Sequence, residues 1–326
     1  MKLKFLGIFI GLILLVFILY FSDAKEVFKI ILSANLNFIF LAAFFFLISI
    51  FLKSLRWQFF LKSIGIKVPY SQAFYSFNSA MIISNLVPFK ALEVLRGYFL
   101  KLKYKISFSK TVPLVLTERA LDVFVYILFS LITIQTMSNF IPFHFTTLAF
   151  FGMLIFFLVS ISVLLVLNNK KLMLKFFNFF VRFPIIKKFK KDLERIVMNF
   201  SIGFNKLKNS KFFIQIISLT FLIWVVEGMI FIFSAKAVGI DLPISLFALP
   251  LISILLGTLT FIPGGTGSTE AVLILLISFL GFPLPQATSA TLIYRGFVHL
   301  LENSIGVVVI SQVYGFNIIE KIKRLK

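Results

Sequence analysis

The chain has 326 residues, of which 60% are hydrophobic, and its formal net charge is +21. A soluble core of this size cannot bury so much apolar sequence, which excludes a soluble globular protein. The chain contains no cysteine, so disulfide scaffolds, cysteine-ligated metal centres and thiol catalysis are excluded as well. We expect an all-α, polytopic protein of the cell (cytoplasmic) membrane.

Six apolar runs are long enough to cross a hydrocarbon core of about 30 Å as helices. The first run ends at residue 21 and lacks a small-x-small cleavage site, so we expect a retained helix. The others cover 36–52, 112–136, 143–167, 212–235 and 287–311. Two further stretches, 71–100 and 245–280, each contain an apolar helix, a proline-centred break and a shorter apolar helix. We predict that both are re-entrant hairpins.

The basic residues predict an orientation, because Lys and Arg are enriched in cytoplasmic loops. With both termini in the cytoplasm, every basic segment lies inside, including Lys53, Arg56, Lys62 and Lys67 after the second span, provided that 71–100 returns to the side it entered. An odd number of crossings then separates the hairpins, which gives them opposite orientations. We therefore predict one transmembrane domain over 1–326, N-in/C-in, with inverted-repeat units at about 36–136 and 212–311. The segment 168–211 is predicted to be a basic, amphipathic cytoplasmic connection.

A repeated pattern supports the two units. Gly-Ile-Lys-Val-Pro at 65–69 is echoed by Gly-Ile-Asp-Leu-Pro at 239–243. In each unit a proline (88 or 263), an acid (93 or 270) and an arginine (119 or 295) follow, at offsets of 174 to 177 residues. Paired, broken hydrophobic segments in corresponding halves point to a transporter-like site near the bilayer midplane.

Ionisable residues inside apolar helices cost about 2.5–3.5 kcal/mol each on insertion scales, so they mark a site or an internal ion pair. In the first unit they are Glu93, Arg96, Glu118, Arg119 and Asp122. The Glu93–Arg96 and Arg119–Asp122 pairs are three residues apart, which places each pair on one helix face. Ion pairs that only hold helices together are the structural alternative for both.

In the second unit the ionisable residues are Glu227, Glu270, Arg295, His299 and Glu302. The last three lie at i, i+4 and i+7, which predicts one stripe along a helix. A satisfied interior histidine is the alternative for His299.

The sequence Pro-Gly-Gly-Thr-Gly at 263–267 predicts a helix break. Gly264, Gly265 and Gly267 would let the chain bend and a ligand approach closely. The helix that follows would present free N–H groups, which makes an anion site; close packing without a ligand is the alternative. We expect Trp57 and Trp224 to be interfacial anchors.

Three ordered motifs resemble those of a known family. Residues 88–96 resemble Pro-x-Arg-x-Gly-Glu-x-x-Arg, with Lys90 and Leu92 replacing the arginine and the glycine. Residues 118–122 match Glu-Arg-x-x-Asp, residues 263–270 match Pro-Gly-Gly-x-Gly-x-x-Glu, and Arg295 corresponds to a late arginine. The chain is thus similar to the membrane region shared by lysylphosphatidylglycerol synthases and their stand-alone, flippase-like relatives.

The resemblance implies a lipid-transport role without naming the lipid. In the bifunctional relatives a soluble domain makes the aminoacyl lipid; none follows here, so we do not expect this chain to transfer aminoacyl groups. We expect a flippase-like protein that moves an anionic or phosphate-bearing (glyco)lipid through a charged midplane cavity. The alternatives are a membrane-embedded enzyme, or enzyme partner, acting on lipid-linked sugar or phospholipid, and a scaffold that transports nothing.

The predicted site divides into two sets of residues. The substrate-binding set is Arg96, Arg119, Arg295, Gly264, Gly265 and Gly267. The charge-balancing or proton-coupling set is Glu93, Glu118, Asp122, Glu227, Glu270, His299 and Glu302. We expect no catalytic constellation, cofactor or metal. The expected partners are membrane lipids and, as a further candidate, a lipid-modifying enzyme, but not nucleic acid; the transport direction, ion coupling and oligomeric state stay open.

Overall fold

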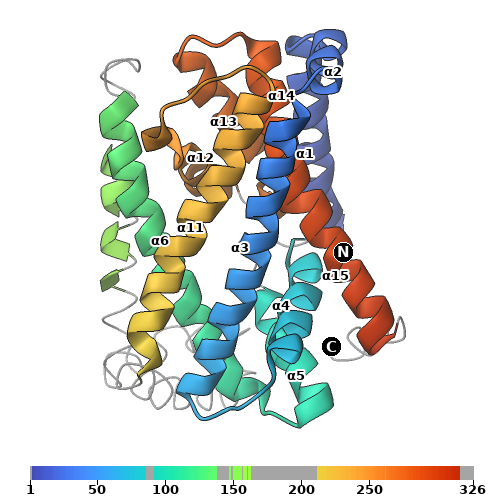
Figure 1. Cartoon of the computed structure of the whole chain (residues 1–326), viewed down its shortest axis with the longest axis vertical. Helices are drawn as coiled ribbons and strands as arrows, with labels where there is room; N and C mark the ends of the chain where they lie inside the picture. Colours follow the sequence, from blue (N-terminus) through green and yellow to red (C-terminus); the bar gives the residue numbers. More distant parts are fainter. Residues whose placement is uncertain are drawn as a thin grey trace.

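The computed structural model describes residues 2–85, 92–137, 147, 150–155, 157–159, 161–162, 211–260 and 262–315. All regular elements in these ranges are helices, which confirms the all-α prediction (Figure 1). The labelled elements of residues 2–137 are α1 (Lys2–Phe21), α2 (Ala24–Leu32), α3 (Leu36–Ser63), α4 (Tyr70–Ser84), α5 (Leu95–Tyr104) and α6 (Phe108–Met137). Those of residues 211–315 are α11 (Phe212–Ala237), η2 (Ile244–Leu246), α12 (Leu249–Thr258), η3 (Pro263–Gly265), α13 (Ser268–Phe279), α14 (Leu284–Arg295), η4 (Gly296–Leu301), α15 (Glu302–Val309) and η5 (Ile310–Tyr314).

Four helical stretches are long and apolar enough to cross a membrane: Leu36–Ser63, Lys110–Met137, Phe212–Ala237 and Leu284–Tyr314. They coincide with four of the six predicted runs, and α1 covers a fifth. The proline break at 88, most of the 143–167 run, the basic connection up to residue 210 and the basic C-terminal residues 321–326 lie outside the described residues. The predicted end of the second span at 52 is wrong, because α3 continues to Ser63.

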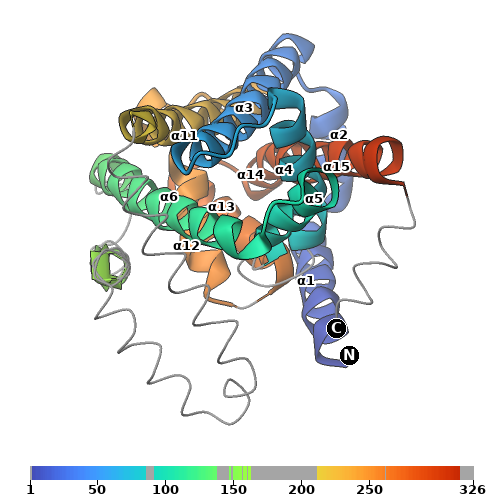
Figure 2. The same ribbon diagram turned by 90° about the horizontal axis from the view of Figure 1, so that it is seen from below.

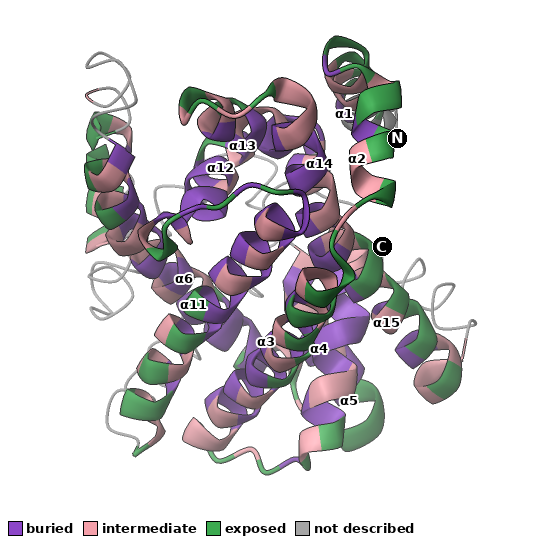
Figure 3. Ribbon diagram, turned by 45° about the horizontal axis from the view of Figure 1, so that its top comes forward, coloured by how far each residue is buried: buried purple, intermediate pink, exposed green. Residues whose placement is uncertain are grey.

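The outer surface of the bundle is apolar, as a lipid-facing surface should be. Leu47, Ile214 and Leu300 expose 62%, 74% and 71% of their surface. Buried residues line the facing sides of α3, α11 and α14 (Figure 3). Figure 2 shows α1 and α15 on one side of the bundle, away from α6 and α11.

The helices α3 and α11 pack along each other on one side of the bundle and run in opposite directions (Figure 2). The Asn35 N–H, just before α3, donates to the Ala237 carbonyl at the end of α11 (2.8 Å). The rings of Phe45 and Phe233 stack across the pair at 5.4 Å. The helices with which the two predicted repeat units begin are therefore antiparallel (Figure 1).

The repeated Gly-Ile-x-x-Pro sequence makes the same turn at the end of each of these helices. Gly65 and Gly239 have φ values of 86° and 81°, a left-handed conformation that favours glycine. The next N–H bonds to the carbonyl four residues before the glycine, at 2.9 Å and 3.0 Å. This is a Schellman-type helix end. Pro69 and Pro243 then stand directly before α4 and η2.

Two helical hairpins follow these turns, at opposite ends of the bundle (Figure 1). The α4–α5 hairpin has helices of 15 and 10 residues, and the α12–α13 hairpin has helices of 10 and 12. At 1.5 Å per residue, each helix measures about 15–22 Å, less than the hydrocarbon thickness. The hairpins also touch: a Cβ on Gly264 in the second break would lie 3.2 Å from the carbonyl oxygen of Asn85, which ends α4.

Candidate functional site

Charged side chains are concentrated inside the bundle. The described residues include ten charged ones that are at most 9% exposed: Lys53, Arg56, Glu93, Arg96, Glu118, Asp122, Glu227, Glu270, Arg295 and Glu302. This distribution, apolar outside and charged inside, is the reverse of a soluble protein. It fits the rule that ionisable residues of membrane helices face the bundle interior and pair there.

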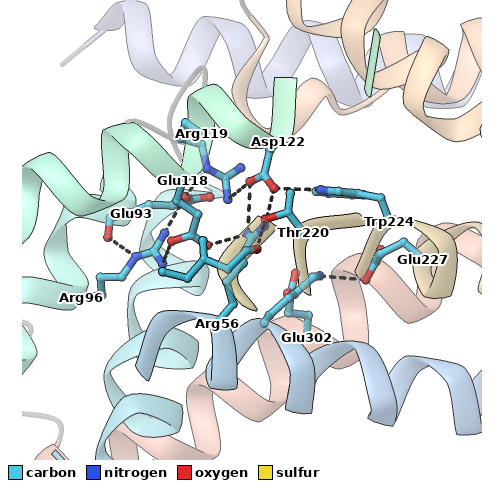
Figure 4. Close-up of polar contacts among 12 residues, drawn as sticks. Arg56, Glu93, Arg96, Glu118, Arg119, Asp122, Thr220, Trp224, Glu227 and Glu302 are labelled. Carbon is cyan, nitrogen blue, oxygen red and sulfur yellow. Dashed lines mark hydrogen bonds and ion pairs between the residues drawn. The ribbon is translucent and has the colours of Figure 1, made fainter. Parts of the chain in front are cut away.

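Six side chains form a closed ring of alternating charge, which we call the arginine ring (Figure 4). Its members are Arg56, Glu118, Arg96, Glu93, Arg119 and Asp122, in order around the ring. Every arginine contacts two carboxylates and every carboxylate contacts two arginines, over N–O distances of 2.6 to 3.2 Å. Three positive and three negative charges make the ring formally neutral. The predicted pairs Glu93–Arg96 (3.1 Å) and Arg119–Asp122 (3.2 Å) are both confirmed.

Three helices bring the ring together, and a fourth supports it. Glu118, Arg119 and Asp122 lie on α6, Arg96 and Glu93 on α5 and the turn before it, and Arg56 on α3. From α11, the Trp224 indole N–H donates to Asp122 (2.8 Å), and Thr220 accepts from Arg56 (3.1 Å). The Arg96 guanidinium lies over the Trp57 ring at 4.7 Å, a cation–π contact.

Arg119 is the accessible arginine of the ring. Its side chain is 30% exposed, whereas those of Arg56 and Arg96 are 2% and 1% exposed. The contacts to Glu93 and Asp122 use Arg119 Nε and Nη2. Because the other two arginines also hold the ring carboxylates, Arg119 can contact a ligand without leaving a carboxylate unpaired.

A second charge set, the lysine triad, consists of Lys53, Glu227 and Glu302. Lys53 Nζ lies 2.9 Å from Glu227 and 3.3 Å from Glu302. The Ser49 hydroxyl, one turn before Lys53 on α3, donates to Glu227. The triad joins α3, α11 and α15, and its two carboxylates face one ammonium group.

The third set pairs Arg295 with Glu270 at the glycine-rich break. Arg295 Nε lies 2.6 Å from Glu270 Oε1, and Glu270 Oε2 accepts from the Gly267 N–H at 2.8 Å. Arg295 Nη2 also donates to the Gly264 carbonyl (3.4 Å). In this structure the start of α13, predicted as an anion site, is therefore capped by the protein's own carboxylate.

The backbone conformation of the break requires the three glycines that were predicted to bind substrate. Gly264, Gly265 and Gly267 have φ values of 64°, 65° and 83°, which a Cβ would strain. A Cβ on Gly267 would lie 2.7 Å from the Gly11 carbonyl oxygen of α1. Close packing, the alternative to ligand contact, is thus visible for Gly267.

The single stripe predicted for Arg295, His299 and Glu302 is wrong, since η4 between them is a π-helix. A π-turn inserts residues relative to the α-helical repeat and so changes which side chains share a face. As a result, Arg295 pairs with Glu270, whereas Glu302 pairs with Lys53.

Sequence reasoning also misplaced four residues. Lys53 and Arg56 were expected among the cytoplasmic loop charges, but they lie inside α3 and hold both larger charge sets. Trp57 and Trp224 were expected at the membrane interface, but they are 0% and 7% exposed and contact the arginine ring. A usable signal was present: Ser49, Lys53 and Arg56 are spaced as one helix face, and apolar residues continue to 61.

The fold and the buried charge sets define a multi-pass, helical integral membrane protein. The chain belongs to the family described as lysylphosphatidylglycerol synthase TM region, which it matches over residues 4–301, so the suspected resemblance is confirmed. It is 30% identical over 221 residues to a UPF0104 membrane protein of Methanocaldococcus jannaschii, covering 66% of this chain and 87% of the relative. A second UPF0104 protein of that organism is 23% identical over 316 residues, 91% of both chains. One from Methanothermobacter thermautotrophicus is 22% identical over 305 residues, 90% of this chain and 87% of the relative.

Proposed function

We propose that this chain transports a lipid with an anionic or phosphate-bearing headgroup across the cytoplasmic membrane. The observation that carries the proposal is the exposure of Arg119 at the edge of an otherwise buried, neutral arginine ring. The family name supports a lipid as the cargo, since its synthase members are named for a phospholipid product.

The arginine ring suits an anionic headgroup that binds and leaves. A guanidinium group stays charged and matches phosphate oxygens with two parallel hydrogen bonds. When a phosphate reaches Arg119, Glu93 keeps its contact with Arg96, and Asp122 keeps its contact with Arg56. The headgroup therefore exchanges with a carboxylate partner of Arg119, and the acyl chains remain in the surrounding lipid.

The architecture supports alternating access. We propose that the antiparallel α3 and α11 begin two inverted-repeat units, N-in/C-in, and that each short-helix hairpin is re-entrant. The contact between Asn85 and Gly264 places the two hairpins tip to tip. Opening one hairpin at a time would expose Arg119 to one side of the membrane and then to the other.

The test is headgroup movement in proteoliposomes that contain purified protein and a labelled phospholipid. Arg119→Ala should slow movement about 10- to 100-fold, as expected for losing a charge-assisted hydrogen bond. Arg119→Lys should recover part of the rate, because it keeps the charge but loses the planar fork. Lys101→Ala, at an exposed position on α5, is the matched control for loss of a surface cation.

Wild-type rates in a folded Arg119→Ala protein would refute the proposed site. Mass spectrometry of the lipid after the assay separates transport from chemistry. An unchanged lipid is expected; conversion of its headgroup by the purified protein would instead identify a membrane-embedded enzyme.

A further inference from the structure

We infer that the lysine triad is a coupling site that takes up one exchangeable monovalent cation, either a proton or a sodium ion. This inference rests on the proposed transport function, which it extends by naming the site that would link lipid movement to an ion gradient. Lys53, Glu227 and Glu302 are distinct from the arginine ring proposed to bind the headgroup.

Charge balance is the first argument. The arginine ring is formally neutral, and so is the Arg295–Glu270 pair. The lysine triad holds two carboxylates and one ammonium group, with side-chain exposures of 4%, 1% and 11%. It therefore carries one surplus negative charge in the bundle interior, where an unbalanced charge is disfavoured. One bound monovalent cation would make the triad neutral as well.

Two buried tyrosines next to the triad are the second, independent argument. Tyr126 on α6 and Tyr294 on α14 are 7% and 2% exposed. The Tyr126 ring meets that of Trp224 at 4.4 Å, and the Tyr294 ring meets that of Phe231 at 5.8 Å; these partners lie three residues before and four residues after Glu227 on α11. None of the hydrogen bonds seen among the described residues uses either hydroxyl, although buried hydroxyls are normally satisfied. These oxygens are thus available to a cation, or to a proton moving to and from the carboxylates.

The tyrosines also connect the triad to the other charge sets. Tyr126 lies one turn after Asp122 on α6, and its ring meets edge-on that of Trp224, the residue that donates to Asp122. Tyr294 directly precedes Arg295, which pairs with Glu270 at the glycine-rich break. The two tyrosines therefore lie between the triad and the other two charge sets.

The other buried charged groups described on the elements packed against the triad already have partners of their own: those of α3 and α6 belong to the arginine ring, and Arg295 of α14 pairs with Glu270. The helices α4 and α12, which pack on α15 and on α11, contain no acidic or basic residue within their bounds. His299 lies in η4, directly before α15. The carboxyl oxygens of Glu227 and Glu302, the Ser49 hydroxyl and the two phenols are all hard oxygen groups. Such groups suit a proton or an alkali cation.

The site can be tested on the purified protein, without a transport assay. If sodium is the cation, replacing choline by sodium should raise the melting temperature, because a ligand of the folded state stabilises it. If a proton is the cation, the wild type should show the infrared band of a protonated buried carboxyl group. Glu302→Gln should abolish whichever signal is seen. Asp241→Asn should leave it unchanged, since Asp241 is a surface acid that is 85% exposed.

Absence of both signals in the wild type, or their persistence in Glu302→Gln, would overturn the inference. If Glu302→Gln does not fold, Tyr294→Phe provides the test, because it removes only a hydroxyl group. A smaller sodium effect or a shifted carboxyl band in this variant supports the site. An unchanged signal contradicts it. In proteoliposomes, a gradient of the same cation should accelerate headgroup movement in the wild type but not in Glu302→Gln. Absence of both signals in a wild-type protein that still moves headgroups would refute the coupling site alone and leave the transport function standing.

Discussion

Replacing Arg56 by methionine tests whether the arginine ring holds the bundle together. Arg56 is 1% exposed, and its guanidinium contacts Glu118 at 2.6 Å, Asp122 at 2.7 Å and the Thr220 hydroxyl at 3.1 Å. Methionine has a similar length but carries no charge. The Arg56→Met protein would therefore keep the packing volume while its ring changes from neutral to a net charge of −1.

The size of the effect follows from the burial of the ring. Removing one partner of a buried ion pair costs about 3–5 kcal/mol, because it leaves an uncompensated buried charge. For 326 residues, an unfolding entropy of about 2.1 cal/mol/K per residue sums to about 0.7 kcal/mol/K. The melting temperature should then fall by about 4–7 °C. Adding Asp122→Asn restores neutrality, so the double variant should be more stable than Arg56→Met.

Tryptophan fluorescence during thermal unfolding in detergent is a direct readout. The chain has two tryptophans, and both contact the ring: Trp57 stacks under Arg96, and Trp224 donates to Asp122. Lys101→Ala is the control and should change stability by less than about 0.5 kcal/mol, as surface substitutions do. The reasoning fails if Arg56→Met melts within about 1 °C of the wild type, or if the double variant melts below the single one.

Three further substitutions probe the packing around the charge sets, each measured by the same melting assay. Gly267→Ala should destabilise the protein more than Gly281→Ala. Both glycines have positive φ (83° and 91°), so an alanine at either position is strained by about 1–2 kcal/mol. Only the Cβ at position 267 would also meet α1, at 2.7 Å. Equal losses would show that α1 does not pack on the break. Trp224→Phe removes a hydrogen bond to buried Asp122 and should cost about 1–3 kcal/mol; an unchanged melting temperature would contradict that bond. Gly306→Leu should cost about 1–3 kcal/mol by overpacking against the α4 backbone, 2.8 Å from its Cβ position, and a neutral result would show that the helices can separate there.

Local patterns in the sequence predicted much of this structure. Apolar run length located four candidate spans, because length and hydropathy are what a bilayer requires. The repeated Gly-Ile-x-x-Pro sequence was interpreted only as a repeat, and the structure adds that it ends two helices with the same geometry. Spacing of three residues predicted the Glu93–Arg96 and Arg119–Asp122 pairs, which depend only on the helix repeat.

Such local patterns could not predict contacts between segments that are distant in the sequence. Arg56 meets Glu118 and Asp122 across more than sixty positions, and local periodicity does not specify which helices become neighbours. The rule that basic residues flank spans assigned Lys53 and Arg56 to a loop, because the rule considers only the charge of a residue and not whether a buried acid pairs with it. A π-turn cannot be predicted from the sequence pattern either. The spacing of Arg295 and Glu302 therefore did not show that they face different sides of the helix.

One helix face connects the charge sets, and this has a mechanical consequence. Ser49, Lys53 and Arg56 follow one another along α3, and their partners lie on α11, α15 and α6. A shift of α3 along α11 would change the lysine triad and the arginine ring together, because the Cα atoms of one rigid helix move as a unit. If the proposed cation exchange at the triad shifts α3 through Lys53, the same shift moves Arg56 and hence the ring that holds Arg119. Under the proposed mechanism, α3 is then a direct mechanical link between the cation site and the headgroup site, alongside the hairpins that open and close.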